Sequence, residues 1–263
     1  MNLLRLLSKT KIKTKGIKME LTAEQISQNW GKLLTIVEKK ITGERKDRLL
    51  ALYNKLEDRM VLAPASGKEH YHNAFPGGYV DHVIRVTLCA LKVKALWEDM
   101  GAAIDFTDEE LVFSALNHDL GKIGSTEEDC YQEETSDWHR KNQGSMYKIN
   151  SKLDFMLIPD RSLFLLQEHG ITVTQKEYFA IKLHDGMYDE SNKPYFVSYN
   201  PDSRLRSNIV HVLHQADFLA SKIEYDTWKS SRKNTAPAAK ELKPTLSVDK
   251  NIKLGAGVKA IEF

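Results

Sequence analysis

The chain has 263 residues, 41% of them hydrophobic and 28% charged, and its 38 basic and 36 acidic side chains leave a net charge of +2. This composition excludes global disorder, and the 14 glycines and seven prolines exclude a collagen-like or low-complexity sequence. No run of about 18 apolar residues occurs, so no membrane-spanning helix is predicted.

The charge is distributed unevenly along the chain. Residues 1–18 carry six basic side chains and no acid, and residues 229–263 carry eight basic and three acidic side chains. Residues 19–228, by contrast, hold 24 basic and 33 acidic side chains. We therefore predict three parts: a disordered basic segment over 1–18, an acidic helical domain over 19–228, and a mobile basic tail over 229–263.

The first residues and the cysteines bear on where the protein works. The apolar stretch within residues 3–7 is too short for the core of a signal peptide. Two interpretations of this start stay open: an organelle presequence, and translation that begins at Met19. Two cysteines, Cys89 and Cys130, cannot supply a disulfide framework for a domain of this size, so we expect a reduced, cytoplasmic protein.

Helical signals open the chain. Thr22 with Gln25 three residues later is typical of a capping box, and it predicts a helix that reaches about Lys40. A second amphipathic stretch predicts a helix from about residue 44 to residue 60, before Pro64. A third helix is predicted after the Gly-Gly pair at residues 77–78, with apolar side chains spaced along one face to Trp97.

Two further capping boxes and one long apolar pattern continue this series. Thr107 with Glu110 predicts a helix that ends near Gly121, and Thr174 with Glu177 predicts one that ends at Gly186. The longest apolar periodicity covers residues 209–223, and a strand signal occurs only at residues 195–199. The sequence therefore predicts an all-α fold over roughly residues 20–228.

All nine histidines fall between residues 70 and 214, which prompts a search for metal ligands. The strongest candidate is His118-Asp119 at the end of the helix that Thr107 opens, followed by Gly121 and Lys122. An imidazole nitrogen and a carboxylate can together hold Zn, Mn, Fe or Mg, and Lys122 could meet a phosphate oxygen. Taken alone, such a pair is more often a capping histidine beside a solvated carboxylate.

The wider order of residues favours the metal site. His82 lies upstream, inside the helix that follows the Gly-Gly pair, and Asp217 lies downstream in the most apolar helix of the chain. A carboxylate in such a helix is costly to bury without a partner, so a metal or a cation is expected beside Asp217.

This order, His82 … His118-Asp119 … Asp217, resembles the HD superfamily of metal-dependent phosphohydrolases. The local sequences agree at residues 72–86 (HNAFPGGYVDHVIRV), 115–124 (ALNHDLGKIG) and 213–226 (LHQADFLASKIEYD). The first of them is most similar to the branch of bacterial 3′-to-5′ exoribonucleases and to phage-encoded HD proteins. The resemblance implies an HD-domain helical bundle, here with an N-terminal helical extension.

The resemblance also implies a ligand set. Superfamily members with two metals add two histidines between the His-Asp pair and the last Asp, and this chain offers His169 and His184 there. Asp119 would bridge the two ions, and Asp185 could act as an acceptor behind the ligands. The implied cofactor is one or two divalent ions (Mn, Fe, Zn, Co, Ni or Mg), held by His82, His118, Asp119, His169, His184 and Asp217.

Such a site implies a mechanism in which Asp119 and Lys122 are the catalytic residues. Divalent ions lower the pKa of a bound water, so that hydroxide can attack phosphorus, and the ions with Lys122 offset the charge on the phosphoryl oxygens. No nucleophile from the protein is required. The P-loop pattern of ATP-driven motors and kinases does not occur.

Substrate contacts are expected from aromatic and basic side chains around the site. His70 and His72 precede the Gly-Gly pair and are expected to flank the pocket. The segment 136–147 mixes aromatic with basic side chains that suit a nucleotide. The same segment could instead be a surface loop with an anchoring Trp, and His139, His211 and His214 are expected to be ordinary packing or surface histidines. The candidate substrate-binding residues are His72, Trp138, Arg140, Lys141, Tyr147 and Arg161.

Three functions stay open. The first is hydrolysis of a phosphate ester of a nucleotide or a nucleotide-derived small molecule. The second is 3′-to-5′ exonuclease action on single-stranded nucleic acid. The exonucleases that the chain resembles carry an additional β-barrel, whereas the first 60 residues here are predicted to form helices. The third is a non-catalytic HD domain that binds a metal or a partner. The acidic central domain favours a small phosphorylated substrate; the oligomeric state is not readable from the sequence.

Overall fold

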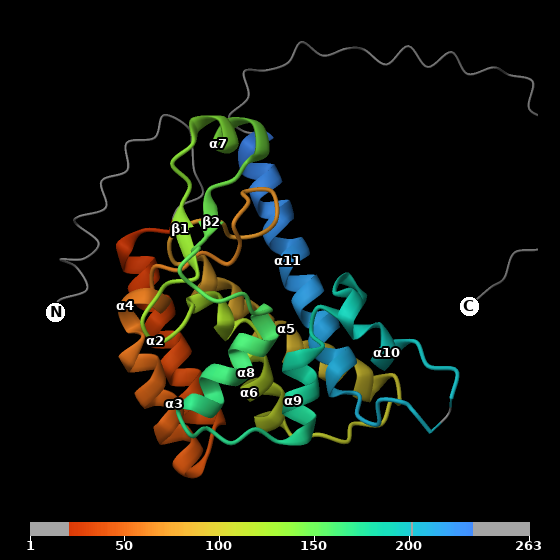
Figure 1. Cartoon of the computed structure of the whole chain (residues 1–263). Coiled ribbons are helices and arrows are strands. Elements are labelled where there is room, and N and C mark those ends of the chain that lie inside the picture. Colours follow the sequence, from red (N-terminus) through yellow and green to blue (C-terminus); the bar gives the residue numbers. More distant parts are fainter. Residues whose placement is uncertain (1–20, 201, 234–263) are drawn as a thin grey trace, which may run out of the picture.

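Helices account for most of residues 21–200 and 202–233, which are the residues that the computed structural model describes (Figure 1). The predicted basic segment 1–18 and residues 234–263 of the predicted tail lie outside them. One boundary of the prediction is wrong, because the last helix, α11 (Ile209–Lys233), continues past Trp228. Ring and cation pairs on its surface, such as Arg232 over Trp228, extend the helix beyond its apolar stripe.

The N-terminal part consists of α2 (Ala23–Lys40), α3 (Gly43–Lys55) and α4 (Glu57–Met60). The Thr22 capping box is present, and α2 ends at the predicted residue. The predicted helix over 44–60 is divided at Leu56, where the backbone leaves the helical region at φ −98° and ψ 8°. The side chain of Leu56 is buried in the core, so this break turns the chain without exposing apolar surface.

The central layer is formed by α5 (Gly78–Asp99), α6 (Asp108–Asn117), α9 (Gln175–Lys182) and α11, with α5 packed against both α6 and α11. The capping boxes of Thr107 and Thr174 are both present, as predicted. A short turn of 3-10 helix, η1 (Leu120–Ile123), follows α6, and α8 (Ile158–Glu168) packs against it.

The remaining elements are short. An antiparallel pair, β1 (Tyr131–Glu133) and β2 (Tyr147–Ile149), brackets α7 (Asp137–Gln143) and projects beside the C-terminal end of α11 (Figure 1). Three-residue strands carry too little alternation to be recognised in a sequence. Two 3-10 turns, η2 (Gly186–Tyr188) and η3 (Glu190–Asn192), lead into α10 (Lys193–Phe196).

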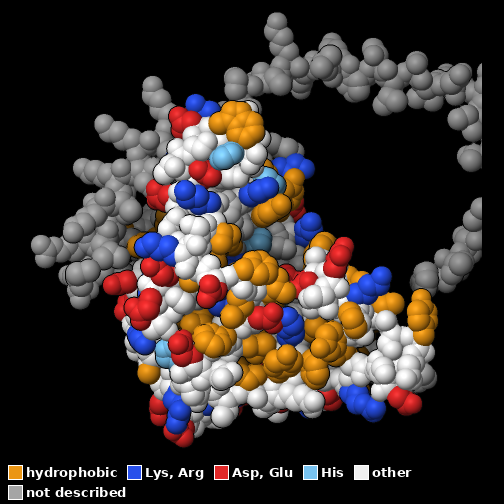
Figure 2. Space-filling model, in the orientation of Figure 1, with side chains coloured by type: hydrophobic (Ala, Val, Ile, Leu, Met, Phe, Trp, Pro, Cys, Tyr) orange, Lys and Arg blue, Asp and Glu red, His pale blue; other side chains and the backbone are white. Residues whose placement is uncertain are grey.

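The strand predicted at residues 195–199 is wrong. The segment begins instead as the last turn of α10, where Pro194 stands in the first turn of a helix and so loses no hydrogen bond. Of the aromatic side chains that suggested a strand, Phe196 packs against the second core cluster beside His211, whereas Tyr195 and Tyr199 are exposed. Exposed apolar side chains also gather over α8 and α9, as Figure 2 shows, and Phe164 and Tyr178 are among the exposed residues of these helices.

Two apolar clusters form the core. The first joins side chains of α2 and α3, such as Leu33 and Tyr53, to α6 and α8. The N-terminal helices therefore pack into the main core of the predicted helical domain. The second cluster lies between α5 and α11 and includes Val86 and Leu213. The all-α fold class is confirmed, and among the described residues no helix has the length and hydropathy needed to span a membrane.

Candidate metal centre

Five of the predicted ligands meet where α5, the end of α6, the end of α9 and α11 come together. The Nε2 atom of His82 on α5 lies 3.6 Å from Oδ2 of Asp119 and 3.2 Å from Oδ1 of Asp217 on α11. The Nε2 atom of His118 lies 3.4 Å from the same Asp119 oxygen, and Nε2 of His184 lies 3.6 Å from the other. Both oxygens of Asp119 thus face imidazole nitrogens.

The turn after α6 places the His-Asp pair. Asp119 leaves the helix at φ −106° and ψ 11°, and the backbone N–H of Gly121 donates to the hydroxyl of Ser162 on α8 (2.8 Å). That hydroxyl donates in turn to the carbonyl of His118 (3.0 Å). A Cβ on Gly121 would lie 2.3 Å from the carbonyl oxygen of Ile158, so only glycine lets α8 approach closely enough to hold the turn.

The histidine rings are oriented by their other nitrogen. Nδ1 of His118 lies 2.8 Å from the carbonyl of Ala115, and Nδ1 of His184 lies 2.8 Å from the carbonyl of Ile181. Because a carbonyl only accepts, each Nδ1 carries a hydrogen, and the Nε2 of the neutral ring keeps its lone pair.

These lone pairs face carboxylate oxygens, which are acceptors too, so a proton or a metal ion must lie between them. Among the described residues, the buried Nε2 atoms of His82 and His118 have no hydrogen-bond partner. Buried polar atoms are rarely left without a partner, and imidazole and carboxylate are ordinary ligands of divalent ions. The residues therefore fit a metal ion.

In the absence of a metal ion, protons lie between the imidazole nitrogens and the carboxylate oxygens. Burial lowers the pKa of His82, but the carboxylates of Glu224 and Asp217 outweigh it and raise the pKa to about 10. Burial likewise lowers the pKa of His184, and Asp185 and Asp119 raise it to about 9. Burial raises the pKa of Asp119, yet Lys122 and the neighbouring histidines hold it well below its usual value. The site favours positive charge at its centre.

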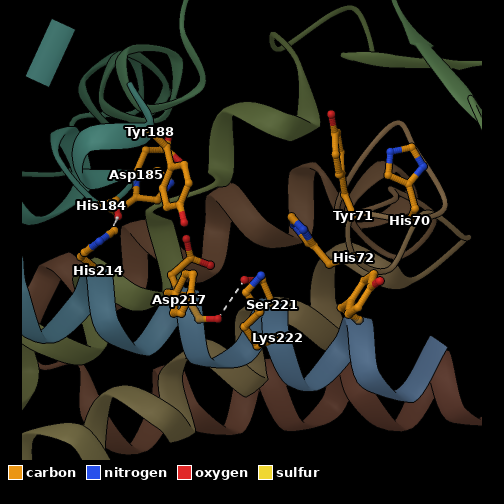
Figure 3. A pocket seen from close by; sticks show the side chains of 12 residues that line it. His70, Tyr71, His72, His184, Asp185, Tyr188, His214, Asp217, Ser221 and Lys222 are labelled. Atoms are coloured by element: carbon orange, nitrogen blue, oxygen red, sulfur yellow. Dashed lines mark hydrogen bonds and ion pairs between the residues drawn. The ribbon is translucent and has the colours of Figure 1, made fainter. Parts of the chain in front are cut away.

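The cluster opens onto a pocket of about 490 Å³ (Figure 3). Helix α11 forms its floor, with Asp217 and Ser221, and His72 enters from the loop before α5. Tyr71 and Tyr188 stand on opposite sides of this pocket, with 54% and 78% of their surfaces exposed. The pocket thus offers two aromatic faces next to the candidate ligands.

One predicted ligand, His169, is outside the cluster. It caps the C-terminus of α8, its Nδ1 lies 2.9 Å from the carbonyl of Leu165, and none of the groups of converging ligand atoms in the described chain includes it. The part of α8 that touches the His-Asp turn is Ser162, and seven residues of helix amount to roughly 10 Å along its axis. The prediction of six ligands is corrected in this respect.

Other residues take roles that sequence reasoning assigned differently or missed. His72, predicted to bind substrate, has a ring nitrogen within 4.8 Å of ligand atoms of His82 and Asp119, and Asp185 forms a similar group with His184 and Asp217. Glu224, which contacts Nδ1 of His82, was missed. Its signal was available, because it is a second carboxylate within the apolar helix, seven residues after Asp217.

The predicted packing histidines differ among themselves. His211 stacks on Trp97, as an ordinary packing residue does, and His139 is exposed. His214 lines the pocket instead, and its Nδ1 lies 2.7 Å from the carbonyl of His184. It therefore helps to hold the backbone of a candidate ligand.

Most of the predicted substrate contacts lie elsewhere. Trp138, Arg140 and Lys141 belong to α7 and do not line the pocket of Figure 3. Tyr147 lines a different pocket of about 400 Å³, which Lys122 also borders. Arg161 is buried on α8 and donates to the carbonyl of Asp154 (2.7 Å), so it braces the loop before that helix. Of the six candidates, only His72 borders both the pocket and the ligands.

Comparison of the chain with protein-family models, with curated proteins and with solved structures finds no match in any of the three. What can be said of its function therefore rests on the site itself: an all-α fold with a buried cluster of histidine and aspartate side chains that could hold a metal ion.

Proposed function

We propose that the chain is a metal-dependent phosphohydrolase of the HD type, which cleaves a phosphate ester of a nucleotide or of a nucleotide-derived small molecule. The observation that carries the proposal is the convergence of buried imidazole nitrogens without partners on the carboxylates of Asp119 and Asp217. Mixed nitrogen and oxygen donors suit Mn, Fe, Co, Ni or Zn, and less well Mg, which prefers oxygen alone.

In this proposal His82, His118, Asp119 and Asp217 would hold one divalent ion. His184 and Asp185, whose side chains lie together beside Asp119, would hold a second. When bound, such an ion supplies Lewis acidity, which lowers the pKa of water and offsets charge on phosphoryl oxygens.

Lys122 supplies the fixed positive charge of the site. Its Nζ lies 2.5 Å from Oδ2 of Asp119. Burial lowers the pKa of the ammonium, but the carboxylate of Asp119 outweighs this effect and raises the pKa above its usual value, so the ammonium stays charged. It orients Asp119 and can receive a phosphoryl oxygen once a substrate approaches. Tyr71 and Tyr188 offer ring faces for a base, and Lys222 on the wall of the pocket offers a further cation.

The test combines metal content with turnover. Protein purified without chelator is analysed for transition metals, then assayed with nucleoside mono- and triphosphates, cyclic nucleotides, (p)ppGpp and a labelled oligonucleotide in the presence of Mn²⁺, Co²⁺ or Mg²⁺. We expect at least one bound ion per chain and release of phosphate or pyrophosphate, both lost in Asp119→Ala. The exposed Asp226→Ala on α11 is the matched control. A chain that neither binds an ion nor turns over any substrate refutes the proposal.

One observation favours the exonuclease as a second candidate. Beyond Asp217, aromatic and basic side chains alternate along α11 in three pairs, with the cation 5.1 Å, 5.8 Å and 4.7 Å from the ring centroid: Phe218 with Lys222, Tyr225 with Lys229, and Trp228 with Arg232. Aromatic rings beside cations are what single-stranded nucleic acid binds. Release of mononucleotides from the oligonucleotide would support this candidate, and metal binding without any turnover would support the non-catalytic HD domain.

A further inference from the structure

We propose that Glu224 is the positioning residue that holds His82 in its metal-binding orientation, an inference that rests on the proposed function. Glu224 lies on α11 with 3% of its surface exposed, and its two carboxylate oxygens lie 3.2 Å and 3.1 Å from Nδ1 of His82. Glu224 and Asp217 are two helical turns apart, so they share a face of α11. Helix α11 thus contributes one candidate ligand, Asp217, and the residue that orients another, His82.

The need for Glu224 follows from where His82 sits. His118 and His184 orient their rings on the carbonyls of Ala115 and Ile181, which belong to the last turns of α6 and α9, where carbonyls lack helical partners. His82 lies near the start of α5, where the preceding carbonyls accept from the amides of the next turn. The ring of His82 therefore needs a side-chain acceptor for Nδ1, in place of the main-chain carbonyls that orient the rings of His118 and His184.

A carboxylate is well suited to this task. It accepts and does not donate, so it keeps the hydrogen on Nδ1 and leaves the Nε2 lone pair toward Asp119 and Asp217. A histidine ligand whose other nitrogen contacts a carboxylate is a recurring arrangement in metal sites, and loss of that carboxylate costs roughly 10- to 100-fold in metal affinity.

The charge of Glu224 is compensated separately. Nε of Arg85 donates to Glu224 (3.1 Å), and the guanidinium also donates to Asp81 (3.0 Å). Asp81 accepts in turn from the side chain of Asn73 (3.0 Å), the residue after His72. The network therefore anchors Glu224 and ties α11 to the loop that carries His72.

Two conservative variants separate orientation from charge. Glu224→Gln keeps an oxygen within reach of Nδ1 and loses the charge, whereas Glu224→Asp keeps the charge beside Arg85 and withdraws the oxygen by one methylene. If Glu224 positions His82, Co²⁺ affinity, followed by visible absorption and calorimetry, stays within about threefold for Gln and falls roughly 10-fold or more for Asp. The opposite order, or an equal Kd in both, overturns the inference. Asp226→Asn on the same helix is the control.

A second measurement is independent of metal binding. In crystals of metal-free protein, the His82 ring should keep its orientation in Glu224→Gln and turn or become disordered in Glu224→Asp; an unmoved ring in the Asp variant also overturns the inference. Wild-type protein that binds no Co²⁺ refutes the proposed function instead, and the ring orientation still decides the role of Glu224. Circular dichroism and thermal melting establish that each variant is folded.

Discussion

Metal ions should compete with protons for the imidazole nitrogens of this site. The affinity for the metal should therefore depend on pH. With pKa values of about 10 for His82 and about 9 for His184, both imidazoles carry a proton on Nε2 at pH 7.5 in the metal-free protein. Ions that bind both nitrogens must release both protons, one at each of the two positions. We therefore expect about two protons released when both positions are filled, and an apparent Kd at each position that falls by up to about 10-fold per pH unit below pH 9.

The assay is calorimetric titration with Mn²⁺ or Co²⁺ at pH 7.5 in two buffers of different ionisation enthalpy. The difference between the apparent enthalpies gives the number of protons released. Titrations at pH 6.5, 7.5 and 8.5 give the slope of the affinity. A Kd that does not change over this range, with no proton release, would refute the placement of His82 and His184 as ligands.

The same groups make the metal-free protein sensitive to alkali. A raised pKa stabilises the folded state fully below the pKa of the unfolded chain, about 6.5 for histidine, and this stabilisation is lost as pH rises through 9 to 10. The loss from His184 alone is on the order of 3 kcal/mol, since each pKa unit is worth about 1.4 kcal/mol. Urea unfolding with chelator at pH 7, 8 and 9 should show it, and saturating Mn²⁺ should remove it.

Three further predictions concern single residues. Replacing His169 with Ala should leave the Co²⁺ affinity unchanged within a factor of two, whereas His184→Ala should weaken it at least 10-fold; calorimetry decides, and equal effects would restore His169 to the site. Lys122→Met should lower kcat by about 10²-fold or more and leave at least one ion bound per folded chain, measured by steady-state assay and metal analysis; unchanged kcat would exclude its catalytic role. Glu177→Ala removes a buried ion pair with Arg45 (2.7 Å) and a capping box, so the free energy of unfolding in urea should fall by roughly 3 to 5 kcal/mol; a fall below about 1 kcal/mol would mean that the pair contributes little.

Helix starts were predictable because their signals are local. The capping boxes of Thr22, Thr107 and Thr174 each satisfy free amides within one helical turn, so a stretch of four residues contains all the groups involved. The His-Asp pair was predictable for a similar reason, because adjacency in the chain places His118 and Asp119 at one helix end. The order of the remaining motifs pointed to His82 and Asp217 through the resemblance.

The wrong prediction of His169 and the omission of Glu224 have the same physical cause, which is packing between helices that are distant in the sequence. Whether His169 or Asp185 stands beside His184 depends on how far α8 extends past the turn at Gly121, which is a matter of packing between helices. The sequence marks Glu224 only as a carboxylate within an apolar helix, whereas its role depends on α5 and α11 being neighbours, which brings together residues 142 positions apart. No window of sequence contains both partners.

By itself, the sequence determined that the chain is helical, where most of its helices begin, and which histidine and aspartate residues are candidates for a metal site. These depend on hydrogen bonds and apolar periodicity within single helices. Only the tertiary structure decided which of those side chains share one cavity, that Glu224 supports His82, and that α2 and α3 belong to the core. Ligand geometry is set by the packing of distant helices, because a metal-sized space requires side chains from α5, α6, α9 and α11 to point at one place at once.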